Sequence, residues 1–272
     1  MRVIVTRPAA QAGKWVKALR AAGMDALSLP LIEIAGPPDP QAVQAVWARV
    51  QRFDALMFVS ANAVEQFFAL QPAGTAVLQD ATSGQPRCYA TGPGSVAALL
   101  QAGVPPNRID APDHAAAQFD SEALWQVVGA QVQPGWRVLI VRGSSQAGAE
   151  GEGADDAEAS QGVGRDWFAA RLGERGATVE FLVSYARRAP QVNANALALL
   201  QAASGDASVW LFSSSEAVTN LCSMAAGQSW DQARAVATHP RIAQAARAAG
   251  FAVVCESRPA LAELIASIES LA

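Results

Sequence analysis

Nearly the same strand–turn–helix pattern occurs twice in this chain, and this internal repeat limits the fold more than any other feature of the sequence. Residues 58–67 read FVSANAVEQF, and residues 212–221 read FSSSEAVTNL. In both copies an apolar run ends in small polar residues, and a segment with the spacing of a helix follows. Internal repeats come before any single motif because they set the architecture.

The repeat extends beyond these two stretches. RVIVTRP at 2–8 parallels RVLIVRG at 137–143, and CYATGPGSVAALLQAGV at 88–104 parallels VATHPRIAQAARAAGF at 236–251. Segments with helical periodicity follow the first pair of apolar runs, and Gly23 and Gly176 stand where these two helices are expected to end. In the other pair of stretches, Gly103 and Gly250 fall in register.

Strands and helices therefore alternate along the chain, which is typical of parallel sheets with helices on both faces. We expect an α/β protein with two flavodoxin-like, parallel-sheet domains. Residues 146–164 depart from the pattern because they are rich in Gly, Ala, Ser and acidic residues and lack apolar periodicity. We expect this stretch to be a flexible acidic insertion.

Composition and charge argue against several classes of protein. The net charge of −4 argues against a nucleic-acid-binding protein. No apolar run reaches the roughly 18 residues that span a bilayer, and MRVIVTRP at the start does not resemble a signal peptide. The three cysteines lie far apart, which argues against a disulfide framework or a zinc site and suits a reducing cytosol. We expect a cytoplasmic protein that binds neither nucleic acid nor membranes.

Four turns, each between a predicted strand and a predicted helix, are candidate anion sites. Ligands of parallel sheets bind outside the carboxyl ends of the strands, and a helix N-terminus presents free N–H groups with partial positive charge. Two arginines, a residue type that suits carboxylates and phosphates, end strands at the same edge. The candidate binding residues are Arg7, Ser60, Ala61, Asn62, Thr91, Gly92, Ser95, Arg142, Ser213, Ser214, Ser215 and Arg241. This set suits a ligand with several carboxylates or phosphates.

Each turn also has an interpretation without a ligand. Ser and Asn are common N-cap residues in any helix, and a duplication copies caps as well as sites. GPGSVA at 92–97 matches the G-x-G-x-x-A dinucleotide fingerprint with Asp110 near the expected distance, but the equivalent turn HPRIA lacks both glycines. The sequence contains neither a serine-hydrolase elbow nor a cluster of metal ligands. We expect the two histidines, His114 and His239, in solvated loops.

Along nearly its whole length, the chain resembles the uroporphyrinogen-III synthase family, the cofactor-free cyclases of tetrapyrrole biosynthesis. The matching stretches, in family order, are VIVTRP with PLIEI, FVSANAV, YATGPGSVAALLQAG, LIVRG, GRDWFAARLGERGATVEFLVSYARR, and FSSSEAVTNL with HPRIAQAARAAGF. The acidic insertion separates LIVRG from GRD, which are often contiguous in family members. The resemblance implies that no cofactor and no metal are needed, and we expect a monomer.

The resemblance also implies a domain arrangement that the repeat alone does not give. One domain contains both chain ends, residues 1–35 and 187–272, and the other contains residues 38–184. The stretches LPLIEIAG and LVSYARRAP would join the domains as a two-stranded ribbon. The active site would be the cleft between the two domains.

The implied substrate is hydroxymethylbilane, a linear tetrapyrrole with eight carboxylates. The implied lyase reaction removes the hydroxyl group as water, inverts ring D through a spiro intermediate and closes the macrocycle to uroporphyrinogen III. Tyr185 matches the family tyrosine proposed to assist the leaving hydroxyl, although it also fits a ribbon residue with its hydroxyl at the surface. Two alternative functions stay open: a two-lobed anion-binding protein, and a nucleotide-dependent enzyme that uses the Gly92 loop.

Overall fold

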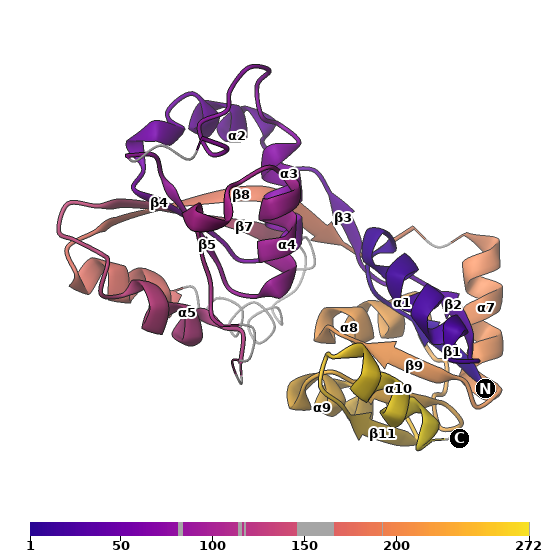
Figure 1. The fold of residues 1–272 in the computed structure, drawn as a ribbon. Helices are drawn as coiled ribbons and strands as arrows, with labels where there is room; N and C mark the ends of the chain where they lie inside the picture. The colour runs from indigo at the N-terminus through magenta and orange to yellow at the C-terminus, as the bar shows by residue number, and fades with distance from the viewer. Residues whose placement is uncertain (81–83, 114–115, 117, 146–165, 192, 272) are drawn as a thin grey trace. The chain divides into compact units, whose positions relative to one another are not determined.

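The chain forms two compact units (Figure 1). Unit 1 contains Met1–Glu33 and Arg188–Ala272, and unit 2 contains Ile34–Arg187. The sequence predicts two folding domains with boundaries near these, and that arrangement stays a prediction. The computed structural model describes residues 1–80, 84–113, 116, 118–145, 166–191 and 193–271. The predicted flexible insertion at 146–164 and His114 lie outside the described residues.

Unit 1 is built around a five-stranded parallel sheet with the order β11-β10-β9-β1-β2. Numbered along the chain within this unit, the order is 2-1-3-4-5, as in flavodoxin-like folds. The strands are β1 (Arg2–Val5), β2 (Asp25–Ser28), β9 (Val209–Phe212), β10 (Arg234–Ala237) and β11 (Val253–Glu256). The helices are α1 (Ala9–Ala21), α7 (Ala194–Gly205), α8 (Ser215–Met224), α9 (Pro240–Ala248) and α10 (Leu261–Glu269).

Unit 2 is built around a six-stranded sheet with the order β3-β8-β7-β4-β5-β6, in which the strands from β8 to β6 run parallel. The strands are β3 (Glu33–Ala35), β4 (Ala55–Phe58), β5 (Arg87–Ala90), β6 (Ile109–Asp110), β7 (Arg137–Ser145) and β8 (Thr178–Arg188). The helices are α2 (Pro40–Trp47), α3 (Ala61–Phe68), α4 (Pro93–Gln101), α5 (Ser121–Val128) and a helix over 166–174, with 3-10 turns η1 (Val50–Arg52) and η2 (Pro106–Arg108). The expected ribbon between the two connector stretches stays a prediction.

The two sheets have the same strand order when β7 is counted as the first strand of unit 2. β7 and β8 then take the places of β1 and β2, and β4, β5 and β6 take the places of β9, β10 and β11. Each sheet therefore combines a β-α-β segment from one copy of the sequence repeat with the remaining strands from the other copy. The expectation of an α/β protein with two parallel sheets is confirmed.

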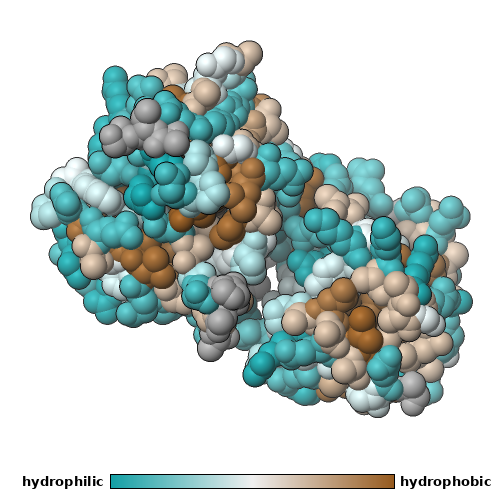
Figure 2. All heavy atoms as spheres, viewed as in Figure 1, coloured by the Kyte–Doolittle hydropathy of each residue, from teal (hydrophilic) through white to brown (hydrophobic). Residues whose placement is uncertain are grey.

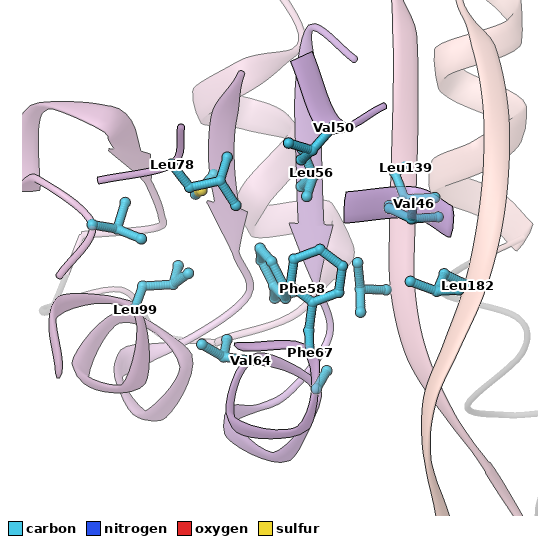
Figure 3. Close-up of a cluster of buried hydrophobic side chains, with 14 of the residues drawn as sticks. Val46, Val50, Leu56, Phe58, Val64, Phe67, Leu78, Leu99, Leu139 and Leu182 are labelled. Atoms are coloured by element: carbon cyan, nitrogen blue, oxygen red, sulfur yellow. The ribbon is translucent and has the colours of Figure 1, made fainter. Parts of the chain in front are cut away.

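The sheet of unit 2 is buried on both faces, which explains why its strands are almost continuously apolar. Phe58, Phe67 and Leu139 belong to a buried cluster that α2, α3 and α4 cover (Figure 3). Met57 and Ile140, the strand neighbours of Phe58 and Leu139, point to the other face and pack in a second cluster with α5 and the helix over 166–174. In Figure 1, α3 and α4 lie on one side of this sheet and α5 on the other.

The predicted helix ends are confirmed by backbone geometry. The predicted end residues Gly23 and Gly176 have φ angles of 83° and 78°, in the left-handed region that favours glycine after a helix. Gly103 and Gly250, with φ angles of 87° and 93°, follow α4 and α9 in the same way. Within the described part of the chain, no helix combines the length and the apolar character needed to cross a membrane. The face of the molecule drawn in Figure 2 carries both hydrophilic and apolar residues, and the most hydrophobic ones lie in separate groups.

Candidate functional site

In each unit, several of the predicted binding residues lie near the carboxyl ends of two adjacent central strands, and the others follow the next strand of the sheet. In unit 2, Arg142 is in β7 and Ser60 follows β4, which pairs with β7. In unit 1, Arg7 follows β1 and Ser213 follows β9, which pairs with β1. These are the points where the strand order of each sheet reverses, and flavodoxin-like folds bind ligands there. We refer to them as the unit 1 site and the unit 2 site.

Tyr185 and Ser60 meet in the unit 2 site although they are far apart in the sequence. The Tyr185 hydroxyl lies 3.1 Å from Ser60 Oγ, and either group can be the donor of this hydrogen bond. Tyr185 is only 4% exposed and packs in the same cluster as Phe58 and Leu182. Most of the Tyr185 side chain is therefore buried in this cluster, and its catalytic role stays a prediction.

A β-bulge in β8 brings Tyr185 to this position. Arg142 of β7 is paired with Val183, but the next residue, Gly143, is paired with Tyr185, so Ser184 is the extra residue. Such a bulge reverses which face of the sheet the following side chains occupy. Without it, strict alternation would place Tyr185 on the face opposite to Leu182 and away from Ser60.

The turn after β4 is built as an N-cap. Ser60 precedes α3, and its Oγ accepts a hydrogen bond of 3.2 Å from the Ala63 N–H. The predicted residues Ala61 and Asn62 form the first turn of α3, and both are half-buried. This capping bond accounts for Ser60 without a ligand, while the contact with Tyr185 goes beyond capping.

The turn after β5 lies beside the turn after β4. Thr91 Oγ1 donates to the Val59 carbonyl at 3.4 Å, and Gly92 is the N-cap residue of α4 without a side-chain cap. Ser95 lies within the first turn of α4 and is 4% exposed, so it is more deeply buried than a turn residue would be. A Cβ atom on Gly92 would lie 3.2 Å from the Cβ of Phe119, a residue that is itself 40% exposed.

The guanidinium group of Arg142 has no carboxylate partner among the described residues. It lies over the ring of Phe181, with Cζ 5.2 Å from the ring centroid. Its Nε is buried and has no hydrogen-bond partner in the part of the chain that the structure describes. A half-buried arginine with an unsatisfied donor favours an incoming anion, because burial of an unpaired charge is costly.

Arg7 has a similar environment in the unit 1 site. Its guanidinium stacks on Trp15 at 4.6 Å and donates two hydrogen bonds, of 2.9 and 3.3 Å, to Gln11 Oε1. Within the described residues it forms no ion pair, and burial lowers the pKa of Arg7. By contrast, Arg87 donates to Asp110 Oδ1 at 2.7 Å, as expected for a structural arginine.

The remaining predicted residues of the unit 1 site lie at two helix starts. Ser213, Ser214 and Ser215 connect β9 to α8, and Ser214, the N-cap residue, makes no side-chain capping bond. At α9, His239 is the N-cap residue, and its Nδ1 accepts from the Arg241 N–H at 3.1 Å. His239 is exposed and lies in the turn before α9, as expected from the sequence, and it also caps that helix.

Four residues that adjoin the unit 2 site were not singled out from the sequence: Gly143, Ser184, Phe119 and Phe181. A glycine inside a strand pattern often marks a bulge, so the sequence alone could have indicated a bulge near Gly143. The exposed aromatic residues carry no such signal, because a buried phenylalanine has the same sequence pattern.

Other site chemistries find little support in the described residues. No group of three or more potential metal ligands occurs there. All three cysteines are free thiols, and burial raises the pKa of Cys88 to about 12, which keeps it protonated. Asp110, the acidic residue of the possible dinucleotide fingerprint, is held by Arg87.

Comparisons with known proteins agree with the sequence resemblance. A family model described as uroporphyrinogen-III synthase HemD matches residues 13–149 and 154–266. The structure of uroporphyrinogen-III synthetase from Helicobacter pylori is similar over 100% of both chains, with 17% identity and a TM-score of 0.58. A mutant uroporphyrinogen III synthase from Thermus thermophilus is similar over 100% of this chain and 98% of that chain, with 16% identity and a TM-score of 0.51. No curated protein matches the sequence.

Proposed function

Because the chain belongs to the uroporphyrinogen-III synthase family, we propose that it is itself an active uroporphyrinogen-III synthase. It is a hydro-lyase that converts hydroxymethylbilane to uroporphyrinogen III, with loss of water and inversion of ring D, in tetrapyrrole (heme) biosynthesis. It acts as a cytoplasmic monomer and needs neither a metal nor a cofactor.

The observation that carries this proposal is a pair of arginines, Arg7 and Arg142, that have no carboxylate partner within the described part of the chain. They occupy equivalent strand ends in the two sheets, and each stacks on an aromatic ring. A substrate with eight carboxylates supplies the charges that these arginines lack. The pyrrole rings of such a substrate also suit exposed aromatic side chains such as Phe181 and Phe119.

Helix starts supply the remaining anion contacts in the proposal. The turns that contain Ser60–Asn62, Thr91–Gly92 and Ser213–Ser215 precede α3, α4 and α8, whose first N–H groups favour carboxylates. Arg241 lies in the first turn of α9. Many moderate contacts of this kind hold a flexible bilane in one folded conformation.

Tyr185 is assigned to the chemical step. Its hydroxyl donates a hydrogen bond to the leaving hydroxyl of the bilane, while Ser60 Oγ, 3.1 Å away, keeps the phenol in place. The carbon–oxygen bond breaks, the hydroxyl leaves as water with one added proton, and the substituted α-carbon of ring D attacks the resulting cation to form the spiro intermediate. The original bond from that carbon to the methylene bridge of ring C then breaks, and the bridge forms a new bond to the other α-carbon of ring D, which loses its proton. The net change is the loss of water. Orientation of the bilane supplies most of the acceleration.

The proposal includes the domain arrangement expected from the sequence. Residues 1–35 with 187–272 form one domain and residues 38–184 the other, joined by the ribbon of the two connector stretches. The substrate binds in the cleft between the domains, in contact with both sites.

Isomer analysis of the product tests the proposal. Purified protein treated with a chelator is mixed with hydroxymethylbilane, and the oxidised products are separated by liquid chromatography. We expect the type III isomer in excess over a protein-free control, in which spontaneous closure gives type I. Binding of the bilane with only type I product would instead indicate the anion-binding protein, and a thermal shift with NAD or a nucleotide sugar would indicate the nucleotide-dependent enzyme.

A further inference from the structure

The bulge in β8 places two consecutive residues on the same face of the sheet. Leu182 and Tyr185 pack in one cluster, and Ser184, between them, donates to the Ala63 carbonyl of α3 at 3.2 Å. Val183, paired with Arg142, is the last residue of β8 in the register before the bulge. Tyr185 therefore reaches α3 only because the chain contains the extra residue Ser184.

Gly143 provides the space that the Tyr185 ring occupies. A Cβ atom at this position would lie 2.4, 2.6 and 2.7 Å from Cζ, Cε2 and Cε1 of that ring. These distances are far below van der Waals contact, so any side chain would displace the ring. The backbone of Gly143 has no positive φ, so space rather than conformational freedom requires glycine here.

Ser184 and Ser60 are held by the same turn of the same helix. Ala63 accepts from Ser184 Oγ through its carbonyl and donates to Ser60 Oγ through its N–H, each at 3.2 Å. The position of the bulge is thus tied to the position of the hydroxyl that contacts Tyr185. A shift of either would change the distance between the Tyr185 and Ser60 hydroxyls.

We infer that Gly143 and Ser184 are positioning residues for Tyr185: the first makes room for its ring, and the second anchors the bulge that turns it toward Ser60. The inference rests on the proposed function, because it concerns the donor to the leaving hydroxyl. A catalytic group displaced by about 1 Å can lower the reaction rate about a hundredfold. Gly143 and Ser184 can therefore affect kcat through the position of Tyr185, although neither residue contacts the substrate.

Gly143→Ala is the direct test. We expect kcat to fall about tenfold to a hundredfold while KM changes less than about twofold, because the carboxylate contacts remain. Gly173→Ala is the matched control in the same unit, since a Cβ atom there would have no neighbour within 4 Å. This control should keep both constants.

The coupling between the two positions separates positioning from a general structural role. In a Tyr185→Ala background the ring is absent, so Gly143→Ala should cause no further loss of kcat. If Gly143→Ala fails to fold, Ser184→Ala serves as the second variant: it should lower kcat about threefold to tenfold, the usual worth of one hydrogen bond, and have no effect on kcat in a Tyr185→Phe background.

A readout that does not depend on activity is nitration of tyrosine by tetranitromethane, mapped by mass spectrometry. Tyr89 and Tyr185 are 0% and 4% exposed, so both should resist nitration in the unaltered protein, and Gly143→Ala should raise nitration of Tyr185 alone. If nitration of Tyr185 rises in Gly143→Ala, the result supports the positioning of Tyr185 by Gly143. If the unaltered protein at the same time forms no type III product, the proposed function is overturned while the positioning stands. Unchanged kcat and unchanged nitration in Gly143→Ala would overturn the inference.

Discussion

At the residue scale, Arg7 and Arg142 differ from arginines such as Arg137, which donates to Glu180 Oε1 at 2.7 Å. Both are half-buried, stack on an aromatic ring and form no ion pair among the described residues. Burial lowers the pKa of Arg7, and no carboxylate among the residues that the structure describes offsets this effect. An arginine in this state contributes little to folding and is available to a ligand.

Arg7→Gln and Arg142→Gln should each raise KM for hydroxymethylbilane about tenfold and change kcat less, because a carboxylate contact persists from substrate to transition state. Their melting temperatures should stay within about 2 °C of the unaltered protein, since no ion pair is lost. Arg171→Gln, which removes an exposed pair with Glu174, is the control and should keep KM. Lower melting temperatures with unchanged KM would make both arginines structural.

Tyr185→Phe should lower kcat about tenfold to a few hundredfold with little change in KM, because the donor is lost while the ring still fills its cluster. Ser95→Ala and Ser214→Ala should cost no more than about 1 kcal/mol each, since backbone N–H groups survive both changes. Steady-state kinetics on the three variants decides. An inactive serine variant beside a fully active Tyr185→Phe would require a serine-centred mechanism.

The sequence identified Ser60 and Tyr185 separately but did not predict that they meet. They are 125 positions apart, and strict alternation along β8 would put them on opposite faces of the sheet. The contact depends on one extra residue in a strand, Ser184, and on the missing side chain of Gly143. Neither effect changes the apolar pattern from which strands are predicted.

At the scale of secondary-structure elements, the strand–turn–helix units follow directly from local sequence. Small polar residues after an apolar run predicted the N-caps of α3 and α8 at Ser60 and Ser214, and glycines predicted the helix ends. The ion pairs that connect elements were not predicted, because their partners are distant in sequence. Glu180 of β8, for example, accepts from Arg49, which follows α2, and from Arg137 of β7.

This ion-pair network predicts a pH dependence of stability. Hydrogen bonds from Arg49 and then Arg137 lower the pKa of Glu180, so its contribution to stability is present above the unfolded pKa of about 4.3 and is lost as the pH falls through the lower folded pKa. Glu180→Gln should therefore cost up to about 1 kcal/mol at pH 7 and nearly nothing near pH 2. Urea unfolding of both proteins at the two pH values measures this. An equal deficit at both would point to packing rather than charge.

At the scale of the whole molecule, the repeat in the sequence does not correspond to the two compact units. The repeat correctly predicts two equivalent parallel sheets, because each copy contains the same alternation of strands and helices. It does not reveal that each sheet takes β-α-β from one copy and its other strands from the second. The copies are combined in this way because distant strands pair, β1 with β9 and β4 with β7. Local sequence patterns do not predict such long-range pairing.

Because each sheet contains strands from both copies of the repeat, cutting the chain between the copies should disrupt both sheets. Fragments 1–134 and 135–272 each lack strands of both sheets, so neither should unfold cooperatively alone, and an equimolar mixture should regain cooperative unfolding. Circular dichroism during heating, for each fragment and for the mixture, measures this. A fragment that unfolds cooperatively by itself would contradict the proposed discontinuous domain.

The central claim is that this chain turns ring D of a linear tetrapyrrole before closing it. The most direct measurement uses hydroxymethylbilane with ¹³C in the ring D side chains and reads the position of the label in the product by NMR. The account predicts that the acetate and propionate side chains of ring D are exchanged in place relative to the other rings in nearly all of the product formed by the protein. A product in which ring D keeps its original orientation, at the rate seen without protein, would contradict it.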